Sequence, residues 1–214
     1  MYHVVGSPPP AEPFPDLYVS RADFALQLAW LHAHGYHAVS LRRVYEYWKR
    51  GYALPPRPIV LTFDDGYQGD FTNVRPLLAM RHWPGVLNLA VRNLLDGKLT
   101  VSQIQALIRN GWEIDGHTIN HIDLTTLRGA DLRHEVAGSR AYIRRRFHVP
   151  VDFFCYPSGR YDSRVLGAVR AAGFLGATIE GAGAASPRDG FLTLPRIRVD
   201  RSDGVSGLAA KLGG

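Results

Sequence analysis

The 214-residue sequence predicts an α/β fold with a parallel sheet, because candidate strands and helices alternate from end to end. About seven candidate strands in a chain of this length fit a small, incomplete barrel better than a full eight-stranded one. A doubly wound open sheet is the alternative, but the glycine fingerprint of dinucleotide binding is missing after the first strands. The chain has no composition break, linker or repeat, so we expect residues 1–214 to form one domain.

Helix and strand signals follow one another along the first half of the chain. Ser20 is a candidate N-cap with Asp23 three residues later, and Gly35 ends the helix that it begins. Pro76 either kinks a helix or marks its first turn. The candidate elements are an apolar start at 1–5, a loop at 7–10, helices at 20–35, 42–50 and 71–81, and strands at 37–41, 58–63 and 86–91.

The second half continues the alternation. Thr100 or Ser102 caps a helix that ends at Gly111. A long amphipathic pattern covers 127–147, and a last strand surrounds Pro195. The remaining candidates are strands at 112–116, 151–156, 174–179 and 192–199 and a helix at 163–172.

Composition is that of an ordinary globular protein, with 46% hydrophobic and 21% charged residues. No apolar run reaches membrane-spanning length, and no signal peptide begins at Met1. The single cysteine, Cys155, excludes an internal disulfide and a cysteine-based metal site. The net charge of +6 is dispersed apart from one run at 144–146, which fits a solvated helix face, so we expect no nucleic-acid partner.

Reactive side chains stand where three candidate strands end. Asp64 and Asp65 follow the apolar run 58–63, and the segments 112–121 and 153–161 contain the ends of two later strands. Carboxyl ends of parallel strands meet at one edge, where active sites of such folds gather. Both aspartates can share one pocket only if their strand is ending, which Gly66 permits. The alternative is that Asp-Asp-Gly only forms a turn and has no role in a site.

His117 and His121 are four residues apart, so on a helical turn both imidazoles face the same side. Two histidines and a carboxylate form a common open site for Zn²⁺. Copper, nickel or cobalt could occupy the same donors, and the sequence does not choose among them. One of the two aspartates could bind the ion while its neighbour takes a proton from water.

Three motifs, residues 61–66 (LTFDDG), 117–121 (HTINH) and 156–159 (YPSG), resemble in order and spacing those of the polysaccharide deacetylase family. This NodB-homology group is also known as carbohydrate esterase family 4. The resemblance spans nearly the whole chain. It implies a distorted (β/α)7-type barrel and metal-dependent hydrolysis of N- or O-acetyl groups on sugars.

The resemblance also implies roles for individual residues. Asp64 would be the general base, and Asp65, His117 and His121 would bind a divalent ion, usually zinc, that activates the attacking water. The backbone N–H of Ser158 would donate to the oxyanion. Thr118, between the two histidines, would shape their loop.

Two positions depart from the usual family pattern. Many members take the general acid from a late histidine, but no histidine follows His148 here. A subgroup acting on poly-N-acetylglucosamine carries Met-Tyr-His at the start of the domain, and residues 1–3 are similar, so we expect His3 to be the acid. Cys155 stands where many members have an arginine that orients the aspartate, and Arg196 or Arg198 could supply that charge instead.

These observations predict an N-deacetylase of an N-acetylglucosamine-containing polysaccharide or oligosaccharide, and leave its oligomeric state open. The alternatives are a sugar-binding module with a vestigial site and, less simply, a glycosidase using Asp64 and Asp65. Adjacent acids rarely reach the separation that two-carboxylate catalysis needs. The resemblance places the protein outside the cell, in the periplasm or in the envelope, although the chain carries no signal peptide.

Overall fold

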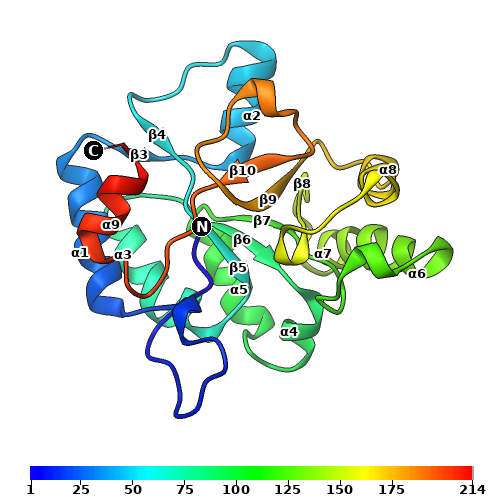
Figure 1. Cartoon of the computed structure of the whole chain (residues 1–214), viewed down its shortest axis with the longest axis horizontal. Coiled ribbons are helices and arrows are strands. Elements are labelled where there is room, and N and C mark those ends of the chain that lie inside the picture. Colours follow the sequence, from blue (N-terminus) through cyan, green and yellow to red (C-terminus); the bar gives the residue numbers. More distant parts are fainter. Residues whose placement is uncertain (214) are drawn as a thin grey trace.

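The computed structural model describes residues 1–213, and a curled sheet of six parallel strands forms its centre (Figure 1). The strand order across the sheet is β10-β9-β8-β7-β6-β5, and every neighbouring pair is parallel. The predicted α/β class with a parallel, incomplete barrel is therefore confirmed. The strands are β5 (Thr62–Asp65), β6 (Val86–Leu89), β7 (Glu113–Gly116), β8 (Phe153–Cys155), β9 (Gly176–Ala182) and β10 (Leu194–Arg196).

Helices surround the sheet and cover its outer face (Figure 1). The outer face of the sheet packs against these helices, and the inner face lies inside the curl. Residues of β6 and β8 are therefore buried on both faces, which is why these strands consist almost entirely of apolar residues. The helices are α1 (Arg21–Ala33), α2 (Leu41–Arg50), α3 (Arg75–Ala79), α4 (Val91–Leu95), α5 (Val101–Arg109), α6 (Gly129–Arg133), α7 (Ser139–Phe147), α8 (Ser163–Ala171) and α9 (Gly204–Lys211).

Several helix ends follow the local signals in the sequence. The Ser20 hydroxyl accepts a hydrogen bond from the Asp23 N–H at 3.0 Å and caps α1. Gly51 ends α2 with a φ of 70°. Thr100, rather than Ser102, caps α5, and it forms a reciprocal capping box with Gln103.

Other elements differ from the sequence-based expectation. The long helix at 127–147 is divided into α6, a π-helical turn (His134–Gly138) and α7. The helix at 71–81 begins as a π-helical turn (Asp70–Val74), and Pro76 lies in the first turn of α3, where a missing N–H costs little. The run at 58–63 is split, since β4 (Pro58–Ile59) leaves the main sheet to pair with β3 (His37–Ala38). Short α4 and glycine-containing α9 were not expected.

The N-terminal segment lies against the free edge of β5. The Tyr2 N–H donates to the Thr62 carbonyl at 2.8 Å, and the Tyr2 carbonyl accepts from the Asp64 N–H at 3.0 Å. The carbonyl of Met1 accepts a hydrogen bond from the segment after β10, the opposite edge strand. The segment then continues into β1 (Val4–Val5), which pairs with β2 (Tyr18–Val19). This path brings His3 to the carboxyl end of β5.

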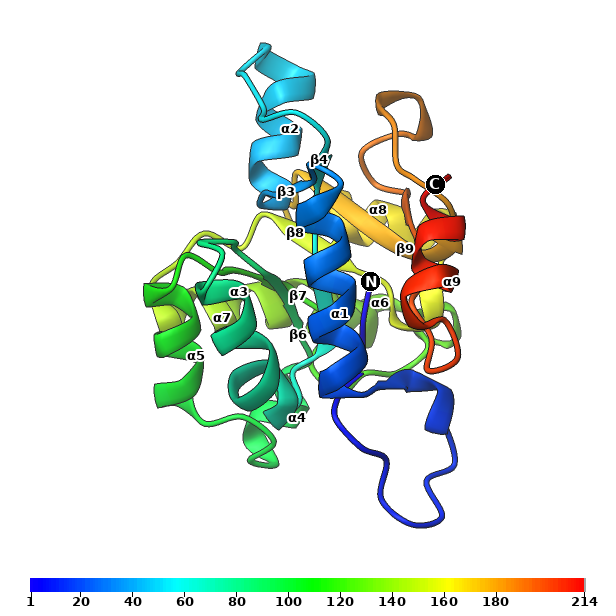
Figure 2. The ribbon, with the colours of Figure 1, turned by 90° about the vertical axis from the view of Figure 1, so that its left-hand side faces the viewer.

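Helices from opposite ends of the chain also meet. Helices α1 and α9 lie side by side in both views (Figures 1 and 2), and the Gln27 side chain donates to the Gly204 carbonyl at 2.8 Å. Within residues 1–213, every helix is too short or too polar to cross a bilayer.

Candidate functional site

Asp64 and Asp65 enter one cavity because β5 ends at Asp65. Asp65 has a φ of 76° and Gly66 a φ of 88°, so the backbone leaves the extended conformation at the second carboxylate. The prediction that the strand ends here is confirmed. A Cβ atom at position 66 would meet Leu89 at 2.7 Å, so the turn needs glycine for space as well. Both carboxylates line a cavity of about 520 Å³ at the carboxyl end of the sheet.

Asp65, His117 and His121 bring three potential ligand atoms together. Asp65 Oδ1 lies 3.3 Å from His117 Nε2 and 3.0 Å from His121 Nε2. The ligand atoms of the three residues all lie within 4.8 Å of one another. Among the described residues, the buried Asp65 Oδ1 has no aligned hydrogen-bond donor despite these short distances. A carboxylate oxygen and two imidazole nitrogens in this arrangement form a possible open metal site.

His117 is oriented by the strand behind it. Its Nδ1 lies 2.7 Å from the carbonyl oxygen of Cys155, which can only accept, so Nδ1 carries a hydrogen. In the neutral ring, Nε2 then directs a lone pair toward Asp65. Burial lowers the pKa of His117, but the neighbouring Cys155 and Asp65 raise it by more, and the net pKa lies well above its ordinary value. Two facing lone pairs need a proton or a cation between them, and the donor set therefore fits a divalent ion.

A loop, rather than the expected helical turn, brings the two histidines together. Thr118 and His121 have φ values of 67° and 54°, in the left-handed region. The Thr118 hydroxyl accepts a hydrogen bond from the His121 N–H at 2.8 Å and closes the loop, as expected of a residue that shapes it. The two imidazole rings are 4.7 Å apart between centroids. The spacing of four residues therefore identified the correct pair of histidines, but the helical turn that it suggested is wrong.

Glu135 holds this loop from the opposite side, a role that sequence reasoning missed. Its Oε2 accepts hydrogen bonds from the N–H groups of Ile119 and Asn120 at 3.0 and 2.9 Å, and its Oε1 accepts from the Asn120 side chain. Glu135 is only 3% exposed and lies in the π-helical turn between α6 and α7. The sequence signal for this role was a glutamate next to the core residue Val136. A carboxylate buried at such a position needs hydrogen-bond partners, which would have pointed to a structural role.

Asp64 is held by a buried arginine from the other edge of the sheet. Arg196 Nη1 and Nη2 donate to Asp64 Oδ1 and Oδ2, each at 2.8 Å, in a bidentate pair. Burial raises the pKa of Asp64, but the charge and hydrogen bonds of Arg196 lower it by more, and the net pKa lies below its usual range. Of the two candidate arginines, Arg196 therefore contacts Asp64, whereas Arg198 pairs with Glu180 and Asp200.

Two further residues contact the Asp64 carboxylate. The Asn88 side chain, which sequence reasoning missed, donates to Asp64 Oδ1 at 2.7 Å. Asn88 lies directly opposite Asp64 in the register of β5 and β6, and a lone polar residue in an apolar strand was its signal. Cys155 is fully buried, and its sulfur lies 3.1 Å from Arg196 Nη2 and 3.5 Å from Asp64 Oδ2.

His3 and Ser158 line the same cavity as the two aspartates. His3 Nδ1 is buried and has no hydrogen-bond partner among the described residues. Burial lowers the pKa of His3, the nearby Asp64 and Asp65 raise it, and the net shift is downward. Ser158 has a φ of 52° and lies in the short 3-10 turn after β8 (Pro157–Gly159). Each residue expected at the site therefore borders one cavity.

Comparisons with a family profile and with known proteins show which sequences this chain resembles. The polysaccharide deacetylase family profile matches residues 51–177. YxkH of Bacillus subtilis (strain 168) is 29% identical over 211 residues, covering 98% of this chain and 72% of that protein. The poly-beta-1,6-N-acetyl-D-glucosamine N-deacetylase of Escherichia coli (strain K12) is 47% identical over 60 residues, covering 28% of this chain and 9% of that protein.

The fold is also shared with a solved structure. The Streptococcus pyogenes deacetylase PplD, solved in complex with acetate, has a TM-score of 0.92 and 25% identity over 99% of this chain and 96% of that chain. The family profile covers more than half of the present sequence. Its matched range includes Asp64, Asp65, His117 and His121. On these grounds, the chain belongs to the polysaccharide deacetylase family.

Proposed function

We propose that this protein is a metal-dependent hydrolase that removes N-acetyl groups from an N-acetylglucosamine-containing polysaccharide. The observation that carries the proposal is a single cavity containing an Asp-His-His cluster beside a second carboxylate that a buried arginine keeps ionised. Such a pair of features provides both a metal site and a proton acceptor, which hydrolysis of an amide requires.

Asp65, His117 and His121 would hold the divalent ion and leave other coordination positions open. When bound, the ion supplies Lewis-acid chemistry, lowering the pKa of water and polarising the acetyl carbonyl. We propose zinc, because two imidazoles and one carboxylate are a frequent donor set of catalytic zinc. Nickel and cobalt accept the same donors.

The chain's own residues have complementary proposed roles. Asp64 accepts a proton from the water whose oxygen attacks the acetyl carbonyl carbon. The backbone N–H of Ser158 donates a hydrogen bond to the carbonyl oxygen as negative charge develops there. His3 donates a proton to the sugar nitrogen while the C–N bond breaks, so that acetate and a free amine leave. Arg196 orients Asp64 and keeps it ionised.

The polymer is proposed from the relatives and from the residues at the cavity. Proteins named as poly-beta-1,6-N-acetyl-D-glucosamine N-deacetylases are among the similar sequences from Escherichia coli and Staphylococcus aureus. His3 borders the cavity here, as expected for an acid supplied by the start of the domain. By the same resemblance, we propose an extracellular, periplasmic or envelope location.

We also propose that residues 1–214 form one domain. The support is that the first residues hydrogen-bond to β5 and that α9 packs on α1. The glycosidase alternative is weakened because Arg196, Asn88 and Cys155 engage the Asp64 carboxylate, which leaves little room for it to protonate a glycosidic oxygen. A sugar-binding module with a vestigial site remains the alternative to test.

Acetate release distinguishes these functions. Purified protein should contain close to one divalent ion per chain and release acetate from chitooligosaccharides or acetylated glucosamine polymers. Chelation should stop release, and added zinc should restore it. If the protein binds the oligosaccharides but releases no acetate with any divalent ion, the module alternative is correct. A hydrolytic rate that is unchanged after metal removal contradicts the proposed use of the ion.

A further inference from the structure

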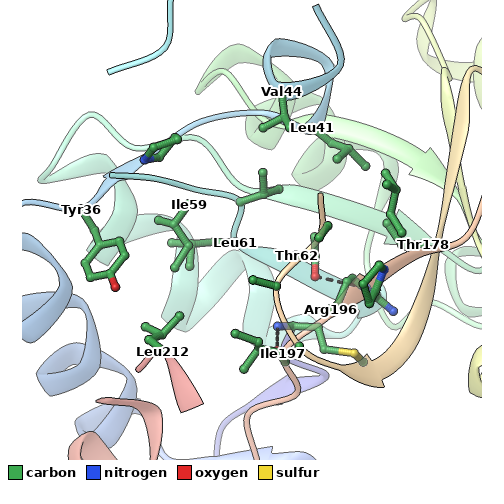
Figure 3. A pocket seen from close by; sticks show the side chains of 18 of the residues that line it. Tyr36, Leu41, Val44, Ile59, Leu61, Thr62, Thr178, Arg196, Ile197 and Leu212 are labelled. Carbon is green, nitrogen blue, oxygen red and sulfur yellow. Dashed lines mark hydrogen bonds between the residues drawn. The ribbon is translucent and has the colours of Figure 1, made fainter. Parts of the chain in front are cut away.

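Helix α2 and the loop that joins it to β4 form one end of the molecule in both views (Figures 1 and 2). The inner side of α2 is apolar, and Leu41 and Val44 point into a cavity of about 470 Å³ (Figure 3). Tyr45 and Trp48 pack against the small core cluster that contains Leu41 and Phe153. These contacts attach α2 to the sheet, but they leave its outer side in solvent.

The outer side of α2 is basic and aromatic. Arg43, Tyr47 and Arg50 are exposed and recur at intervals of four and three residues, so they share one side of the helix. Tyr52 follows in the loop and is 51% exposed. The Arg43 Nη2 donates to the Ala53 carbonyl at 2.9 Å and holds this loop beside the helix. We call the side chains of Arg43, Tyr47, Arg50 and Tyr52 the α2 surface.

Most of the positive charge at this end of the molecule is unpaired. Residues 41–57 contain five basic side chains and one acid, Glu46, and therefore carry +4 of the net charge of +6. Glu46 and Asp152 both pair with Arg42, and the turn Pro187–Asp189 nearby carries one charge of each sign. Within the described part of the chain, no carboxylate forms an ion pair with the other four cations, which are Arg43, Lys49, Arg50 and Arg57.

Exposed tyrosines distinguish the α2 surface from the other basic run of the chain. The arginines at 144–146 on α7 are also exposed, but the large apolar side chains of that helix are buried or half-buried. Basic side chains beside tyrosines fit the interface of an anionic bilayer, where arginine meets lipid phosphates and the phenol ring lies among the head groups. A polyanion would use the cations alone, and a stable protein partner needs a larger apolar patch.

We propose that the α2 surface docks the protein on an anionic membrane surface. Its arginines bind lipid phosphates, its tyrosines lie at head-group level, and Lys49 and Arg57 add charge beside it. Residues 13–17, which border the cavity of Asp64 and Asp65, lie at the opposite end of the molecule (Figures 1 and 2). A docked protein therefore keeps that cavity open to the solvent. The proposal does not rest on the proposed function, because vesicle binding is measured without turnover.

Cosedimentation of the full chain with vesicles of equal parts phosphatidylglycerol and phosphatidylcholine tests the docking. We expect saturable binding that weakens as sodium chloride rises from about 0.05 M to about 0.5 M, and no binding to pure phosphatidylcholine. The double variant Arg43→Gln/Arg50→Gln should bind about 25-fold more weakly, at about fivefold for each basic residue. Arg144→Gln/Arg145→Gln is the matched control, because it removes the same charge from α7, and it should weaken binding less than about threefold.

Tyr52→Ser tests the apolar part of the contact. It should weaken vesicle binding about threefold, whereas Tyr52→Trp should retain it. All variants should keep the circular dichroism spectrum of the wild type, since each replaced side chain is exposed.

Four results would each overturn the proposal. The anionic vesicles are not bound, the two double variants weaken binding equally, or Tyr52→Ser binds vesicles as the wild type does. The fourth result is that soluble polyglutamate binds as tightly as the vesicles at equal charge, which would indicate a site for a polyanion rather than a membrane.

Discussion

Replacing Arg196 by methionine should lower the free energy of unfolding more than the other charge-removing substitutions considered below, Arg198→Met and Glu135→Gln. The Arg196 and Asp64 side chains are only 7% and 3% exposed, and two hydrogen bonds of 2.8 Å join them. Methionine fills much of the space but leaves the Asp64 carboxylate buried without its cation. Breaking a buried pair in this way costs about 3–5 kcal/mol, a large share of the usual stability of a domain.

The cost of Arg196→Met should also depend on pH. In the wild type, Arg196 holds the pKa of Asp64 below its ordinary value of about 3.9, so the stabilisation is present above that value and is lost as the pH falls through the folded pKa. In the variant, burial dominates and raises the pKa of Asp64 above its ordinary value. Asp64 can then become neutral at mildly acidic pH, and the difference in stability between the two proteins should shrink as the pH falls from 7 toward 4.

Urea unfolding of the metal-free proteins, monitored by circular dichroism across this pH range, measures the difference. Arg198→Met is the matched control, because Arg198 lies two residues away and its ion pairs are about one-third exposed. The control should lose about 1 kcal/mol or less. The reasoning is refuted if Arg196→Met costs no more than Arg198→Met at pH 7, or if its cost is the same at pH 7 and pH 4.5.

Three further predictions concern the proposed reaction. Asp64→Asn should lower kcat by at least about 10²-fold while the protein keeps its metal, whereas His117→Ala should lose both, as measured by acetate release and metal analysis. Glu135→Gln should destabilise the protein by about 1–3 kcal/mol and weaken metal affinity about 10- to 100-fold, because the loop loses charged hydrogen bonds. His3→Ala should lower kcat by about 10²–10⁴-fold and leave metal content unchanged.

Each of these predictions has a clear contrary result. Equal metal loss in Asp64→Asn and His117→Ala would remove the division between base and ligand. Wild-type metal affinity in Glu135→Gln would mean that the loop keeps its shape without this carboxylate. A wild-type rate for His3→Ala would exclude His3 as the acid.

Much of the fold could be predicted because its signals are local. The N-caps at Ser20 and Thr100 and the glycine end of α2 depend on hydrogen bonds between residues that are close together in the sequence. The residue types at these positions are therefore enough to predict them. The π-helical turns could not be predicted in this way. The turn at His134–Gly138 places Glu135 beneath the histidine loop, which is a contact between separate segments rather than a local preference.

In the site, too, the residue types could be predicted from the sequence, whereas the contacts between separate segments could not. Adjacent acids at the end of an apolar strand and two histidines four residues apart pointed to His117, His121 and one of the two aspartates without any structure, and the family resemblance selected Asp65. The conformation that joins them, with left-handed Thr118 and His121, could not be inferred, because spacing alone is compatible with both a helical turn and a loop. The same is true of Asn88, whose contact with Asp64 follows from strand register.

The sequence by itself determined the alternation of most strands and helices, the residue types of the metal-binding candidates and the family. The tertiary structure alone decided which arginine holds Asp64, since Arg196 and Arg198 both suited that role in the sequence. Curling of the sheet brings β10 toward β5 across 132 residues of chain and directs Arg196 to the aspartate, while Arg198 pairs with Glu180. Local patterns select residue types and elements, whereas a bidentate pair between two edge strands depends on how the whole sheet closes.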